Sequence, residues 1–97
     1  MITHIAMLRF KEGVEPAAVE AATAALLELP DLVPSIRSFS VGRDLGLTDA
    51  TLDYAIVARF DDIAGYQAYA DHPDHVRVLT EHTRPLTAEV MRVQFED

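Results

Sequence analysis

Apolar and polar residues alternate over the first ten positions of the chain in the way that is typical of a β-strand. In a strand at residues 2–10, His4 and Leu8 point to one face. Ile5 and Met7 point to the other face. Both faces are largely apolar, so both are expected to be covered in the folded protein.

The remaining periodicity predicts three further strands and two helices. They are strands at residues 36–43, 52–60 and 89–95, and helices at residues 16–29 and 62–70. Pro30 is predicted to end the first helix, and Asp61 to cap the second. The order is that of a ferredoxin-like α+β domain, βαββαβ, with a four-stranded antiparallel sheet that carries its helices on one face.

The second helix is interrupted by a proline. Pro73 disfavours helical geometry at His72, so the helix should stop there and a further helical segment should begin at Pro73. Ile63 is predicted to face the core from the helix. Val76 and Leu79 are predicted to face it from the restarted segment.

Helices on one face leave the other face of the sheet bare. That face would expose Ile5, Met7 and Val57, an apolar patch of a kind that soluble monomers rarely show. A second copy packed sheet to sheet would cover it, so we expect a symmetric homodimer through the open sheet face.

Composition excludes several classes of protein. A chain of 97 residues suits one domain, 1–97, and its formal net charge of −8 has the wrong sign for a nucleic-acid partner. No apolar stretch approaches the roughly 20 residues of a membrane span, and the N-terminus does not resemble a signal peptide, so a cytoplasmic protein without a membrane partner is expected. There is no cysteine, phosphate loop or zinc signature, and we expect no cofactor and no metal.

Titratable side chains concentrate in one stretch, residues 66–75, which holds two of the three tyrosines and two of the four histidines. His75 falls at the third position of the segment that begins at Pro73, where the helix dipole favours a neutral imidazole, the form that a general base needs. The alternative is a structural His75 that bonds a backbone carbonyl and packs the helix junction. His72 with His75 has the spacing of a weak metal pair, without an evident third ligand.

Two other aromatic or imidazole groups are expected near His75. Tyr69 lies one helical turn from Tyr66, a pair that is more often core than site, although a buried phenol needs a hydrogen-bond partner. His4 lies on the face of its strand that the helices cover, where it either packs in the core or lines a cleft.

The chain resembles the stress-responsive dimeric A/B barrel domain, Dabb, nearly from end to end. The matching segments are HIAMLRFK at 4–11, LP at 29–30, IRSFSVGR at 36–43, DYAIVARF at 53–60 and YQAYADHPDH at 66–75. The last is the most specific, with the pattern Tyr-x-x-His-Pro-x-His.

The resemblance implies a dimeric α/β barrel built from two ferredoxin-like protomers. One plant branch of the family contains a cofactor-free polyketide cyclase in which a histidine acts as base and a tyrosine assists. Those roles would fall here on His75 and Tyr69, with His4 in the same pocket. Tyr54 stands where that branch has another histidine.

Together these observations predict a pocket between sheet and helices that binds a small, partly apolar, polyketide-like molecule. Its predicted catalytic residues are His75 and Tyr69, and its predicted binding residues are His4, Ala6, Leu8, Tyr54, Ile56 and His72. The chemistry would be proton abstraction next to a carbonyl. The alternative is a stress-associated dimer that binds or supports other molecules without turnover.

Overall fold

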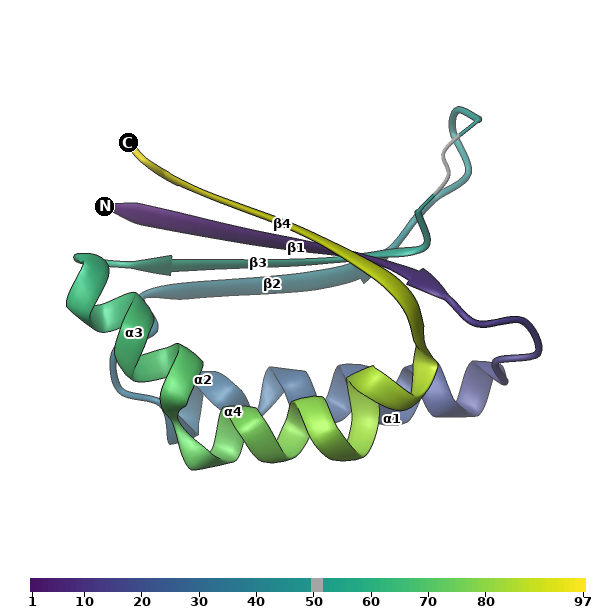
Figure 1. The fold of residues 1–97 in the computed structure, drawn as a ribbon, viewed down its shortest axis with the longest axis horizontal. Coiled ribbons are helices and arrows are strands. Elements are labelled where there is room, and N and C mark those ends of the chain that lie inside the picture. Colours follow the sequence, from purple (N-terminus) through teal and green to yellow (C-terminus); the bar gives the residue numbers. More distant parts are fainter. Residues whose placement is uncertain (50–51) are drawn as a thin grey trace.

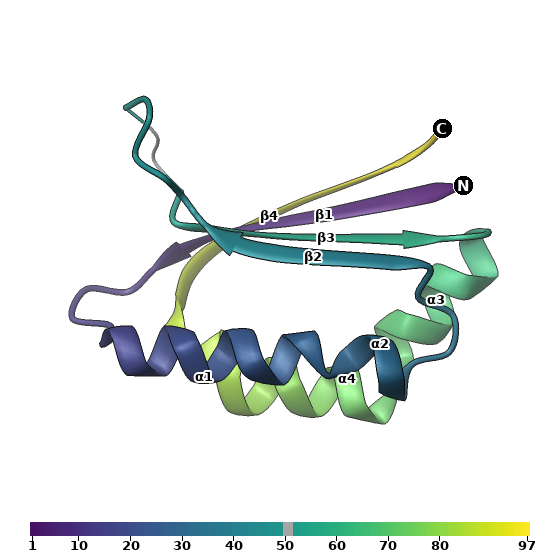
Figure 2. The same ribbon diagram turned by 180° about the vertical axis from the view of Figure 1, so that it is seen from behind.

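The computed structural model describes residues 1–49 and 52–97, and it shows one sheet with helices along one side (Figures 1 and 2). The elements in chain order are β1 (Ile2–Phe10), α1 (Pro16–Leu27), α2 (Leu29–Leu32), β2 (Ser38–Arg43), β3 (Tyr54–Phe60), α3 (Ile63–Asp71), α4 (Pro73–Val78), the π-helical turn η1 (Leu79–Thr83), the 3₁₀ turn η2 (Arg84–Leu86) and β4 (Thr87–Glu96). This order confirms the ferredoxin-like α+β fold that the periodicity predicts.

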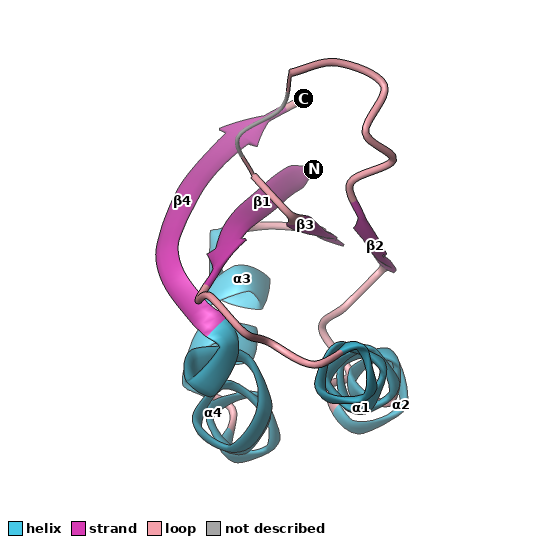
Figure 3. Cartoon of the chain, turned by 90° about the vertical axis from the view of Figure 1, so that its right-hand side faces the viewer, coloured by secondary structure: helices cyan, strands magenta, loops and turns pink. Residues whose placement is uncertain are grey.

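The four strands are arranged in the order β2-β3-β1-β4, and all neighbours are antiparallel. The register places His4 opposite Ala58 on β3 and Gln94 on β4. Figure 3 shows β4 and β1 above α3 and α4, and β2 above α1. Residues from both ends of the chain therefore meet over the α3–α4 junction.

The core lies between the sheet and the helices. The largest fully buried side chains are Leu26, Leu29, Val33, Phe60 and Val78. Alternate residues of β3 are buried from Tyr54 to Phe60, and the residues between them are partly exposed. The sheet therefore has the inner and outer faces that the alternation predicts.

Two predictions about helix ends and one about the start of a strand were wrong. The first helix ends at Leu27, and Pro30 lies near the start of α2, where its missing N–H needs no partner. The cap of α3 is Asp62 rather than Asp61, and its carboxylate accepts a hydrogen bond from the Gly65 backbone N–H at 2.8 Å. The last strand also starts two residues earlier than predicted, at Thr87.

Two predicted core residues are exposed instead. Ile63 is the first residue of α3, and 63% of its surface is accessible. In α4 the helix begins at Pro73, and the inner positions are His75 and Val78, so Val76 points outward. Residues three or four apart share a face of a helix, so the position at which α4 begins decides which of its side chains face the core.

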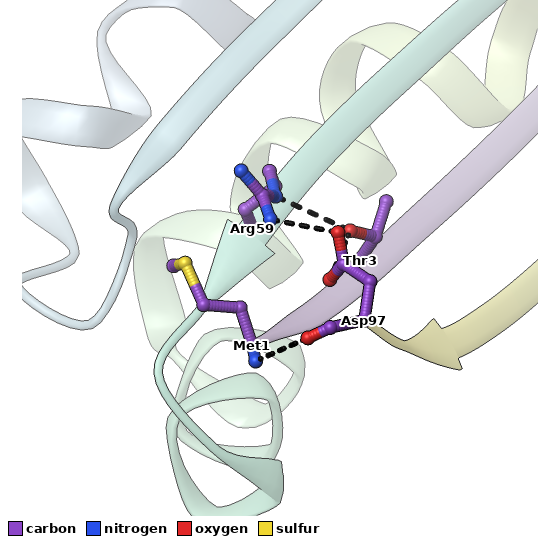
Figure 4. Close-up of polar contacts among 4 residues, drawn as sticks. All are labelled: Met1, Thr3, Arg59 and Asp97. Atoms are coloured by element: carbon purple, nitrogen blue, oxygen red, sulfur yellow. Dashed lines mark hydrogen bonds and ion pairs between the residues drawn. The ribbon is translucent and has the colours of Figure 1, made fainter.

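The face of the sheet opposite the helices is open in the single chain (Figure 1). Met91, Val93 and Phe95 of β4 are each about half exposed there, opposite β1 residues in the strand pairing. A polar cluster closes one end of the sheet (Figure 4). In it Arg59 donates to Asp97 at 2.8 Å, which ties β3 to the end of β4.

No helix in the described part of the chain is long and apolar enough to cross a membrane.

Candidate functional site

A small cavity lies between the helix-facing side of β1 and β4 and the segment from α3 to η1. Its volume is about 100 Å³. Its lining comes from every layer of the fold: His4, Ala6, Leu8, Leu26, Ile56, Tyr66, Tyr69, Ala70, His75, Leu79, Thr83, Thr87, Val90 and Arg92. Six of the eight residues that the sequence predicts for the pocket are in this lining.

The two exceptions are Tyr54 and His72. The Tyr54 hydroxyl lies 2.6 Å from the hydroxyl of Thr23 on α1, so its side chain closes the core beside the cavity. His72 is the N-cap of α4, and its Nδ1 accepts a hydrogen bond from the Asp74 backbone N–H at 3.1 Å. Both side chains have structural partners, and neither is among the residues that line this cavity.

The proline break orients His75. In an unbroken helix the Ala70 carbonyl would accept from the N–H of Asp74, four residues on. That N–H is instead bonded to His72, because Pro73 ends α3 and restarts the chain as α4. The Ala70 oxygen is thereby left for the ring of His75, whose Nδ1 lies 3.2 Å away.

This contact fixes the tautomer of His75. A carbonyl oxygen only accepts, so Nδ1 carries the proton and donates it, and Nε2 is left with a free lone pair. Burial lowers the pKa of His75, and the nearby Arg84 adds to this, while the bond to Ala70 acts in the opposite direction. The ring is therefore neutral at neutral pH, which is the form of a general base.

His4 has the opposite tautomer. The amide nitrogen of Gln94 lies 2.8 Å from His4 Nδ1, and an amide nitrogen only donates. The proton of a neutral His4 is therefore on Nε2. Burial lowers the pKa of His4, and the positive charges that His75 and Arg92 can carry lower it further. The cavity thus has one imidazole that accepts and one that donates.

The ring of Tyr69 lies near both imidazoles. Its ring centroid is 4.0 Å from that of His75 and 6.1 Å from that of His4. Only 2% of the residue is exposed, and burial raises its pKa above the ordinary range, so its hydroxyl stays protonated. This hydroxyl makes no hydrogen bond to any side chain or backbone group of residues 1–49 and 52–97, and it remains a donor for a bound molecule.

Sequence reasoning missed the two threonines and the arginine of the lining, Thr83, Thr87 and Arg92. Thr83 is buried at the end of the π-helical turn and donates its hydroxyl proton to the Leu79 carbonyl at 3.3 Å. Arg92 enters because the strand pairing places it opposite Ala6. The alternation of the last strand predicts that Val90, Arg92 and Gln94 share one face. That this face lies beside His4 follows only from the pairing register of β4 with β1.

The described residues bring together no group of three or more metal-ligating side chains. The cavity instead offers a lone-pair acceptor on His75, N–H and O–H donors on His4 and Tyr69, and a cation on Arg92. Such a set can hold an oxygen-bearing group and move a proton next to it.

The fold and this cavity define a ferredoxin-like α+β domain with a site between sheet and helices. The model of the stress responsive A/B barrel domain, Dabb, matches residues 2–97, and the chain belongs to this family.

Relatives agree with this assignment. The stress-response A/B barrel domain-containing protein HS1 of Arabidopsis thaliana is 25% identical over 81 residues, which are 81% of this chain and 74% of that protein. A dimeric ferredoxin-like protein of unknown function from Thermobifida fusca is 40% identical, with a TM-score of 0.91 over 99% of this chain and 90% of its own. The hydroxynitrile lyase of Passiflora edulis shares the fold, with 17% identity and a TM-score of 0.84 over 97% and 90% of the two chains.

Proposed function

We propose that this chain binds a small carbonyl compound in the cavity and that His75 removes a proton from the carbon next to the carbonyl. The observation that carries the proposal is the bond from His75 Nδ1 to the Ala70 oxygen, which leaves Nε2 of this cavity-lining residue unprotonated. A neutral imidazole with a free lone pair in a buried site is the group that this chemistry requires.

The proposed proton transfer requires no group other than the ligand and the residues that line the cavity. The lone pair of His75 Nε2 takes the α-proton, and the electrons of the C–H bond form the enolate. Its oxygen gains negative charge and accepts hydrogen bonds from Tyr69 and from His4 Nε2–H. The imidazolium of His75 then returns the proton to the same carbon or to another atom of the ligand.

The size of the cavity limits the ligand. A volume of about 100 Å³ is below the roughly 300–1,000 Å³ of drug-sized sites, and it holds a reacting group of a few non-hydrogen atoms. A polyketide chain, which the family resemblance implies, does not fit in this cavity alone. The lyase of Passiflora edulis acts on hydroxynitriles by name, and its fold supports small-molecule chemistry as one use of this architecture.

We further propose a homodimer through the open sheet face. Relatives with the same fold are dimeric, and Met91, Val93 and Phe95 are half exposed on that face. A second copy would bury this patch, which a lone chain leaves in water.

The proposed chemistry is testable without the natural substrate. The wild-type protein is incubated with butanone in deuterium oxide, and NMR follows the loss of the α-proton signals. Exchange should be faster than in buffer, and His75→Asn should abolish the acceleration. His82→Asn, which changes a histidine outside the cavity, should retain it.

Two results would count against the proposal. An acceleration that survives His75→Asn would remove His75 from the role of base. Wild-type protein that does not accelerate the exchange at all would favour the alternative, a dimer that binds without turnover.

A further inference from the structure

A second concave surface adjoins the cavity. It is an open groove of about 320 Å³ at the start of α3 and the end of β4, lined by Ile2, Ile63, Tyr66, Gln94, Phe95 and Glu96. We call it the α3–β4 groove. Its walls are mostly apolar. Its volume lies within the roughly 300–1,000 Å³ that small-molecule sites have.

The α3–β4 groove and the cavity share one lining side chain. Tyr66 lines both of them. Its ring centroid lies 5.1 Å from that of His4, which faces the cavity. Gln94 lines the groove and at the same time bonds His4 Nδ1 at 2.8 Å. The Tyr66 ring also packs against Phe60, with ring centroids 5.8 Å apart.

The groove explains an exposure that the core does not. Ile63 starts α3 with 63% of its surface accessible, although a large aliphatic side chain on this helix is expected to face inward. A second copy on the open sheet face would reach the groove only at Phe95, because Ile63 and Tyr66 belong to α3 and Gln94 alternates with Phe95 on β4.

We propose that the α3–β4 groove holds the apolar tail of the ligand whose carbonyl head lies in the cavity. The ligand class is then a carbonyl compound with an unbranched alkyl chain or a single aryl group. Tyr66, which lines both spaces, turns aside to admit the tail where it leaves the cavity, while Gln94 keeps its bond to His4. This inference rests on the proposed function, because it takes the position of the head from it.

A series of primary amides tests the inference, since an amide has the carbonyl head and does not react. The probes are acetamide, butanamide, hexanamide and octanamide, and their binding to the full chain is measured by calorimetry or by NMR titration. If the tail is buried, the affinity should rise by about threefold to fourfold for each added methylene group.

Two variants separate the groove from the cavity. Ile63→Asp puts a charge on the groove wall, at a helix start that tolerates an acidic residue, so the dependence on chain length should disappear while acetamide binds unchanged. The matched control is Leu27→Asp at the end of α1, where 52% of the leucine is exposed away from the groove, and it should keep the full dependence. Tyr69→Phe should weaken all four amides by a similar factor, because it removes a donor to the head.

Affinities that do not rise with chain length would overturn the inference, as would a rise that persists in Ile63→Asp. If butanone exchange through His75 is intact in either case, the proposed function stands without the groove. If no amide binds and no exchange occurs, both fall together.

Discussion

The stability of the protein should fall as the pH drops below about 6.5, because two buried histidines resist protonation in the folded state. Only 6% of His4 and 8% of His75 are exposed, and burial is the main cause that lowers the pKa of each below its ordinary value. Unfolding exposes both rings to water and restores the ordinary pKa. Protons therefore bind the unfolded chain more readily, and acid favours unfolding.

The size of the effect follows from this linkage. Above the unfolded pKa both states are neutral and stability does not depend on these groups. At about pH 5.5 a histidine that stays neutral in the fold costs at most about 1.4 kcal/mol, so the two together cost at most about 3 kcal/mol. The loss levels off once the pH falls below the lowered, folded-state pKa. A loss of this size is a substantial part of a typical unfolding free energy of about 5–15 kcal/mol.

The assay is urea unfolding of the protein at fixed concentration, repeated from about pH 8 to about pH 5. His4→Asn and His75→Asn each remove one titrating ring, so each variant should lose roughly half as much stability over this range as the wild type. The exposed carboxylates of Asp61 and Asp97 have lowered pKa values and titrate at lower pH, outside this window. A wild-type stability that is flat between about pH 7 and about pH 5 would refute the reasoning, as would an unchanged loss in both variants.

Three further predictions concern the parts that support the site. His72→Ala should lower the unfolding free energy by about 1 kcal/mol and slow butanone exchange, because it removes the cap that occupies the Asp74 N–H. His72→Asn keeps a capping side chain, so its stability and its exchange rate should both be close to those of the wild type. Thr23→Val should cost about 1–2 kcal/mol in urea unfolding, since it leaves the buried Tyr54 hydroxyl without its partner, and should leave exchange nearly unchanged. Val93→Asp on the open face should convert the dimer to a monomer in sedimentation, and a dimer that persists would contradict the proposed interface.

The order of the elements could be predicted from the sequence because periodicity is local. The alternation in β1 and β3 and the helical spacing after Pro16 each depend on a few neighbouring residues. The outward position of Val76 was missed because it depends on where α4 starts. With the start at Pro73 the inner positions are Val78 and His75, the second of which was predicted to face the pocket.

The candidate site was predictable in part, because the motif that marks it is also local in the sequence. The pattern Tyr-x-x-His-Pro-x-His marks the break at Pro73. The exchange of hydrogen bonds that follows from this break cannot be predicted from the spacing of the residues. His72 takes the Asp74 N–H, the Ala70 carbonyl is freed, and His75 takes the carbonyl. Arg92 was missed because its place depends on the register of β4 against β1, which is a long-range pairing.

The central claim is that His75 is a neutral imidazole with its proton on Nδ1 and an open Nε2 in the cavity. A long-range ¹H–¹⁵N correlation spectrum of the histidine rings tests this most directly, with His75→Asn used to assign the signals. The account predicts the Nδ1–H tautomer for His75 at neutral pH, and an Nε2 signal that shifts when acetamide is added. An Nε2–H tautomer, or an imidazolium at neutral pH, would contradict it.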